Sequence, residues 1–185
     1  MMTELALNVL DVTENSVRAD ASLVHVSVAV DTTADRMVIL IEDNGCGMTA
    51  EQVASVEDPF FTTRTTRKVG LGIPFYKYAA LATGGDFSIT SEVGVGTKVR
   101  AEFVLSHVDR MPLGDMCSTM HTLITFNTHI DFVYTYTVDD RSFTLDTREF
   151  KEILEGVPLN EPEVSAYVEA FLIENTEEVN QGILL

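Results

Sequence analysis

The sequence predicts a two-layer α/β sandwich, with helices on one face of a mixed β-sheet and a small α/β extension after residue 106. Three observations lead to this prediction. Polar residues recur every three or four positions between residues 4 and 19, which is the period of a helix. Valines occupy alternate positions from 24 to 30, the period of a half-buried strand. Residues 37–41 are apolar without interruption, as in a central strand covered on both faces.

The pattern then alternates between helices and strands. After a turn at residues 42–45 we expect a short helix near 50–56 and an irregular stretch at 58–68. A further helix opens at Gly70, has Pro74 in its first turn, where a missing N–H is tolerated, and closes at Gly84. Alternating apolar residues at 87–89 and 99–103 predict two strands joined by a turn through Gly94 and Gly96.

Residues 106–185 carry a second set of elements. Pro112 is expected to start a helix with one apolar stripe, and residues 132–145 to form a hairpin around Asp139. Two final helices are introduced by capping-box patterns, Asp146 with Glu149 and Asn160 with Glu163. The apolar face expected for the last helix consists of Val164, Tyr167, Val168, Phe171 and Leu172.

Composition limits the class of protein. A chain of 185 residues holds one domain, or one domain and an appendage. Two cysteines, Cys46 and Cys117, make neither a disulfide framework nor a C-x-x-C metal pattern. No apolar run approaches the length of a membrane span, and the start of the chain has no basic segment typical of a signal peptide. We therefore expect a cytoplasmic protein without a membrane segment.

The net charge of −17 is unevenly placed. Residues 1–105 hold 8 basic and 14 acidic residues, giving −6, and residues 106–185 hold 4 and 15, giving −11. Such a surface repels phosphate backbones, so nucleic acid is not an expected partner. One local exception is the basic cluster of Arg64, Arg67 and Lys68, which suits a small polyanion. The alternative is a solvated basic loop.

Groups suited to each part of a nucleotide occur in order along the chain. Asp43 follows a strand and can accept the amino group of adenine, with Gly45 and Gly47 letting the backbone approach a ring. Asn15 can offer an amide oxygen to Mg²⁺. A helix N-terminus binds phosphate through its free N–H groups. The residues that can form this phosphate site are Thr62, Thr63, Arg64, Arg67, Lys68, Gly70 and Gly72.

Four motifs resemble those of the GHKL superfamily, which contains DNA gyrases, heat-shock chaperones, histidine kinases and mismatch-repair ATPases. Residues 11–21, which include Asn15, resemble its N-box, and Asp43-Asn44-Gly45-Cys46-Gly47-Met48 looks like its first glycine box. Pro59-Phe60-Phe61-Thr62-Thr63 matches the segment before the lid in histidine kinases. Gly70-Leu71-Gly72 resembles the second glycine box, and residues 91–97 the closing one. The match covers residues 4–105, and we expect residues 1–105 to form the ATP-binding domain.

The resemblance implies a role for each matching residue. It places Mg²⁺ on Asn15, phosphate on Arg18, adenine on Asp43 and Thr97, and the lid hinge in Gly70-Leu71-Gly72. The chain departs from the pattern in two places. Lys68 stands where the second box usually begins with a glycine. Asp11 stands where the gyrase branch has its catalytic glutamate, so that Asp11 is either a general base or a plain helix carboxylate.

Two functional hypotheses remain open. The first is a histidine-kinase-like ATPase that hydrolyses ATP or passes its γ-phosphate to a partner protein in signalling. The second is a non-catalytic nucleotide sensor whose acidic extension, residues 106–185, holds a partner. Residues 106–113 also resemble the phosphoacceptor box of histidine kinases, but Val108 replaces the acidic residue that normally follows the histidine. We expect no phosphorylation of His107.

Overall fold

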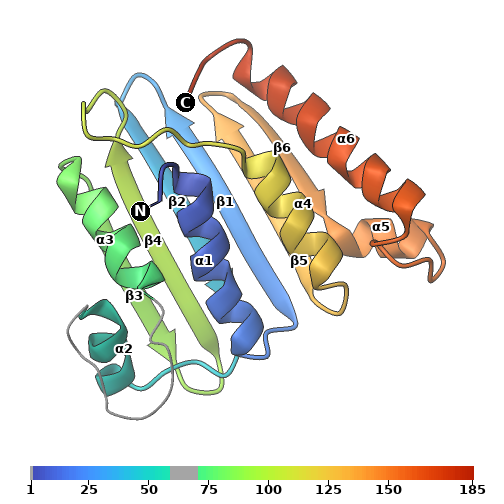
Figure 1. Ribbon diagram of the computed structural model, residues 1–185, viewed down its shortest axis with the longest axis horizontal. Helices are drawn as coiled ribbons and strands as arrows, with labels where there is room; N and C mark the ends of the chain where they lie inside the picture. The colour runs from blue at the N-terminus through green and yellow to red at the C-terminus, as the bar shows by residue number, and fades with distance from the viewer. Residues whose placement is uncertain (1, 59–70) are drawn as a thin grey trace.

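The computed structural model describes residues 2–58 and 71–185, which form one sheet with helices packed against it (Figure 1). The sheet has six strands in the order β3-β4-β2-β1-β5-β6. The strands are β1 Leu23–Asp31, β2 Arg36–Asp43, β3 Asp86–Glu92, β4 Gly96–Val104, β5 Asp131–Val138 and β6 Arg141–Asp146. The helices are α1 Leu5–Arg18, α2 Ala50–Glu57, α3 Gly72–Ala82, α4 Met116–Phe126, α5 Thr147–Ile153 and α6 Pro162–Asn180.

The sheet is mixed, as predicted. β1 pairs in parallel with β5, from Leu23 opposite Asp131 to Val30 opposite Val138. The other neighbours pair antiparallel. The hairpin β5–β6 therefore continues the sheet formed by the first four strands, and the buried apolar side chains of both parts belong to one core. That residues 106–185 act as a separate docking unit stays a prediction.

The core lies between the sheet and helices α1, α3 and α4, which cover the same face (Figure 1). Val24, Val26, Val28 and Val30 are buried there, as their alternation predicts. The apolar run at 37–41 was interpreted wrongly as a strand covered on both faces. Its alternate residues Val38 and Leu40 are only half-buried on the other face of the sheet.

The predicted helix start at Pro112 is wrong, because this segment has a different partner. The carbonyls of Pro112 and Leu113 accept hydrogen bonds of 2.9 and 2.8 Å from the backbone N–H groups of Leu5 and Ala6 in the first turn of α1. They supply acceptors that a helix N-terminus lacks within itself. α4 begins only at Met116, after the side chain of Asp115 accepts the N–H of Ser118 at 2.8 Å.

The last two helices follow the prediction in part. Asp146 caps α5, as expected, but α6 begins at Pro162 with Glu161 as its N-cap residue, so the predicted cap at Asn160 is wrong. Proline fixes the first helical position, which moves the start by one residue. Of the predicted apolar face, Val164, Val168 and Leu172 are buried, whereas Tyr167 is 62% exposed. Among the described residues no helix is long and apolar enough to cross a membrane.

Candidate functional site

Asp43 ends β2 with both carboxylate oxygens engaged. The hydroxyl of Ser16 donates to Asp43 Oδ2 at 2.6 Å, and the backbone N–H of Gly45 donates to Oδ1 at 2.9 Å. Ser16 is 3% exposed on α1, directly after Asn15, whose amide is exposed. These bonds fix the orientation of a partly exposed carboxylate. The arrangement joins the predicted metal-binding helix to the predicted adenine acceptor.

Strand register places two hydroxyl residues beside Asp43. Thr97 of β4 lies opposite Asp43, and Ser91 of β3 lies opposite Thr97. The hydroxyl of Ser91 is 2.8 Å from that of Thr97 and accepts the backbone N–H of Met48 at 2.8 Å. Because side chains alternate along a strand, all three share the helix-covered face with Ile41. Thr97 is a predicted site residue, whereas Ser91, which begins the closing motif at residues 91–97, has no predicted role.

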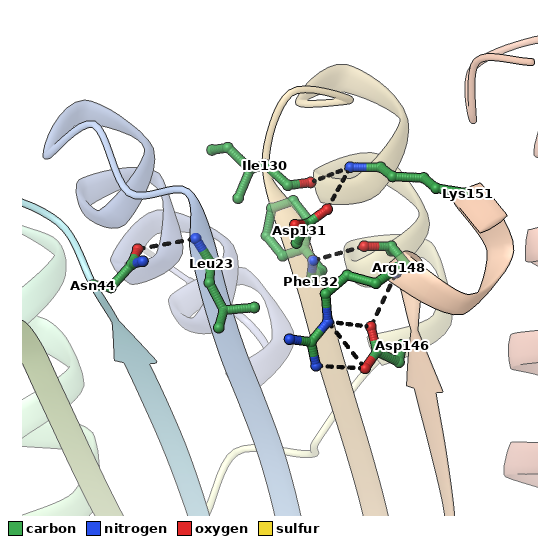
Figure 2. A network of polar contacts seen from close by, with 9 residues as sticks. Leu23, Asn44, Ile130, Asp131, Phe132, Asp146, Arg148 and Lys151 are labelled. Carbon is green, nitrogen blue, oxygen red and sulfur yellow. Dashed lines mark hydrogen bonds and ion pairs between the residues drawn. The ribbon is translucent and has the colours of Figure 1, made fainter. Parts of the chain in front are cut away.

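The loop between β2 and α2 is held from three sides. Asn44 Oδ1 accepts the N–H groups of Ser22 and Leu23, both at 2.9 Å, and Figure 2 shows its contact with Leu23. Cys46 N–H donates to the carbonyl of Ala19 at 2.9 Å, and its carbonyl accepts from Gly94 N–H at 2.8 Å. The loop thus connects the end of α1 to the turn between β3 and β4.

Gly45 and Gly47 are required by this packing. A Cβ on Gly45 would lie 2.7 Å from the carbonyl oxygen of Ala19. Gly47 has a φ of +68°, and a Cβ there would overlap the backbone of Glu92. The glycines therefore let three chain segments approach one another. Their contact with a nucleotide ring stays a prediction.

Asp11 meets the first residue of α3. A Cβ on Gly72 would overlap the half-buried carboxylate of Asp11, so glycine at this position lets the two helices meet. A carboxylate near a helix N-terminus is stabilised by the partial positive charge there. Asp11, Asn15 and Arg18 follow one another at four and three residues along α1, which places them on one side of the helix.

Arg18 remains available to a ligand. Its only ion pair among the described residues is with Glu14, at 4.0 Å, and its side chain is 64% exposed. An exposed pair of this kind contributes little to stability, so it can be exchanged for a stronger anion. Leu71, the N-cap residue of α3, is 45% exposed.

The remaining predicted residues cannot be placed. Thr62, Thr63, Arg64, Arg67, Lys68 and Gly70 lie outside the described residues. Within residues 2–58 and 71–185, no three or more His, Cys, Asp or Glu side chains form a group that could hold a metal ion. The amide oxygen of Asn15 alone is compatible with Mg²⁺ binding. In nucleotide sites this ion is held mainly by phosphate oxygens and water, with only one or two protein ligands.

Comparisons with known proteins show which family and which proteins this chain resembles. The sequence model of the family described as "Histidine kinase-, DNA gyrase B-, and HSP90-like ATPase" matches residues 2–107. A sensor protein of Shewanella frigidimarina is 38% identical over 85 residues, which are 44% of this chain and 13% of that protein. Sensor kinase CckA of Brucella abortus is 37% identical over 86 residues, which are 46% of this chain and 9% of the kinase. The chain thus matches only a small part of the length of these relatives.

A solved structure gives the same fold. The N-terminal domain of a DNA repair protein superposes with a TM-score of 0.52 at 14% identity, covering 78% of this chain and 53% of the other. At this identity the likeness concerns the fold alone.

Proposed function

The chain belongs to the family of histidine kinase-, DNA gyrase B- and HSP90-like ATPases, and on this premise we propose that it binds Mg-ATP and hydrolyses it or transfers its γ-phosphate to a partner protein in signalling. The observation that carries the proposal is Asp43, held by Ser16 and Gly45 beside Thr97. The proposed setting is the cytoplasm.

Asp43 has the capacity to bind adenine as well as its protein donors. An ionised carboxylate offers about four acceptor positions, and Ser16 and Gly45 occupy one on each oxygen. The amino group of adenine can donate to a remaining position, and the hydroxyl of Thr97 lies next to it in the sheet. Because the carboxylate is already oriented, binding does not have to restrict it further.

The phosphate end of the nucleotide is assigned to the second half of α1 and the start of α3. Asn15 supplies the metal-binding oxygen, Arg18 supplies positive charge, and the N–H groups near Gly72 can receive a phosphate oxygen. Bound Mg²⁺ would neutralise phosphate charge. Asp11, which faces this end, is the candidate for orienting an attacking water or hydroxyl group.

A protein acceptor would find apolar side chains next to this site. On α3 and just before it, Leu71, Phe75, Tyr78 and Leu81 are 45, 50, 73 and 48% exposed. Exposed apolar side chains gathered on one helix are typical of a docking surface. They support transfer to, or communication with, a second protein.

The alternative function is a nucleotide sensor without catalysis. It is favoured by the position of Asp11, whose carboxylate lies against the backbone of Gly72. A carboxylate packed against a helix N-terminus has a structural role there, through the partial positive charge of the helix end, that requires no catalysis. Incubating the protein with γ-labelled ATP and Mg²⁺ separates the two functions, because an enzyme releases labelled phosphate or transfers it, and a sensor does neither.

The nucleotide site is tested by Asp43→Ala, with Glu42→Ala as a matched control. Glu42 is the preceding residue of β2, so its side chain points to the other face of the sheet, where it pairs with Lys98 at 3.6 Å. Calorimetry with Mg-ATP should show binding lost in Asp43→Ala and kept in Glu42→Ala. A folded Asp43→Ala protein with unchanged ATP affinity would refute the assignment.

A further inference from the structure

A strongly acidic surface lies on α5, on α6 and on the connection between them. Its nine carboxylates are all exposed, and within the described residues none of these side chains makes an ion pair or a hydrogen bond. They are Glu149, Glu152, Glu155, Glu161, Glu163, Glu169, Glu174, Glu177 and Glu178. We call this surface the α5–α6 face.

The two cations of residues 147–180 do not neutralise this surface. Arg148 binds Asp146 at 2.6 Å, and Lys151 binds Asp131 at 2.6 Å. Figure 2 shows both pairs at the ends of β5 and β6. Each cation is therefore engaged with a carboxylate that belongs to the sheet. Neither cation forms an ion pair with any of the nine glutamates, although Arg148 also attracts the neighbouring Glu149.

Apolar side chains are exposed among these glutamates. Ile153 at the end of α5 is 80% exposed, Val157 in the connection 44%, and Tyr167 on α6 62%. The ring of Tyr167 lies 5.9 Å from that of Phe150, which in turn packs at 5.6 Å against Phe171. Tyr167 is thus held in place from the core side while its outer surface faces solvent. A fixed aromatic residue of this kind is typical of the centre of an interface.

We propose that the α5–α6 face docks a partner protein through a segment rich in lysine and arginine that also presents apolar side chains. Unpaired carboxylates attract such a segment at long range and set its orientation, whereas burial of Ile153, Val157 and Tyr167 supplies affinity. The same charge repels nucleic acid and anionic lipid surfaces. The proposal defines the chemistry of the partner and does not depend on nucleotide binding.

The probe is a fluorescent helical peptide of lysine and leucine, with a lysine-glycine peptide of equal charge for comparison. Binding is measured by anisotropy without ATP. The test variant is Glu152→Gln/Glu155→Gln/Glu163→Gln, and Tyr167→Ala removes the aromatic centre. The control variant, Asp109→Asn/Asp86→Asn/Glu51→Gln, removes three exposed charges that lie on other elements, Asp86 being on the opposite edge strand of the sheet. All of these side chains are exposed, so the variants should remain folded.

We expect peptide affinity to fall only in the variants whose substitutions lie on the α5–α6 face. The triple glutamate variant should bind the lysine-leucine peptide about tenfold more weakly, because several close charge pairs are removed together. The control variant should change affinity by less than about twofold, as expected for distant, screened charges. Tyr167→Ala should weaken binding of the lysine-leucine peptide and leave binding of the lysine-glycine peptide unchanged.

Two outcomes would overturn the proposal. Equal weakening by the test and control triple variants would show attraction to the net charge alone. Unchanged binding of the lysine-leucine peptide to Tyr167→Ala would show that no apolar docking takes place. Neither outcome bears on the nucleotide site, which is read out separately by ATP calorimetry on Asp43→Ala.

Discussion

Replacing Ser16 by alanine tests whether the carboxylate of Asp43 must be held in place before a nucleotide binds. The Ser16 hydroxyl is nearly inaccessible to solvent and donates to Asp43 Oδ2 at 2.6 Å, while Gly45 N–H donates to Oδ1. Alanine leaves the second bond intact. One oxygen then loses its protein donor, and the carboxylate gains freedom to rotate.

The change in stability follows from the hydrogen bond that is lost and from the higher helix propensity of alanine. A hydrogen bond to a charged group contributes about 1.5–3 kcal/mol, and the lower end applies because Asp43 is partly exposed to water. Alanine improves helix propensity by about 0.5 kcal/mol. The net loss of about 1 kcal/mol lowers Tm by about 2–4 °C. Restricting a freed side chain on binding costs about 0.5–1.5 kcal/mol, so the Kd for ATP should rise by a factor of about 2 to 13.

Calorimetry with Mg-ATP and thermal unfolding measure the two effects, and Thr13→Val is the matched control. Thr13 is fully buried on the same helix, and its hydroxyl has no hydrogen-bond partner within the described residues. Valine keeps its shape and removes an unsatisfied polar group, so ATP affinity should stay unchanged and Tm should not fall. Wild-type affinity in Ser16→Ala, or an equal loss in Thr13→Val, would refute the reasoning.

Four further outcomes are expected. Asn15→Ala should remove the Mg²⁺-dependent part of ATP affinity, measured by calorimetry with and without the metal. Asp11→Asn should keep ATP binding and lose any phosphate release, and a parental rate would place the base elsewhere. Arg148 holds the pKa of Asp146 below its usual range, chiefly through a hydrogen bond. The resulting stability is present above the ordinary pKa near 3.9 and is lost as the pH falls through the lower folded value. Urea unfolding should therefore separate Asp146→Asn, which keeps the helix cap, from the parent at pH 7, and the difference in the free energy of unfolding should shrink as the pH falls below the ordinary pKa near 3.9. With γ-labelled ATP, no acid-labile label should appear on His107, and label that disappears in His107→Ala would show that it is an acceptor.

The elements could be predicted because burial on one face leaves a period in the sequence. Valines at alternate positions of β1 report that face directly. Residues 37–41 do not form a strand covered on both faces, because apolar residues also favour strands on a half-exposed surface. Val38 and Leu40 lie on such a surface. Pro112 does not start a helix, because its carbonyl accepts a hydrogen bond from the first turn of α1, more than a hundred residues earlier in the chain. Local sequence contains no sign of a partner at that separation.

The motifs that point to a ligand identified residues that the structure brings together, and whether these residues bind a nucleotide stays a prediction. A residue that acts on another residue was not identified. Asp11 and Gly72, predicted separately, meet between α1 and α3, and Asp43 and Thr97 meet across two strands. Ser16 lies on the buried, mainly apolar side of α1, and it has no predicted role. A serine among buried apolar residues needs a hydrogen-bond partner, and that requirement was the available signal. Its partner could not be identified, because 27 residues separate it from Asp43.

The parallel pairing of β1 with β5 has a consequence for how the chain folds. Leu23 must find Asp131, 108 positions later, before the sheet is complete. Contacts this far apart in sequence carry a cost in chain entropy, so contact order predicts slow folding. Until β5 is synthesised, β1 is an open edge strand, and the N-terminus of α1 lacks the acceptors of residues 112–113. The emerging N-terminal half therefore exposes the kind of unpaired strand on which chains aggregate, and its own later residues are what protects it.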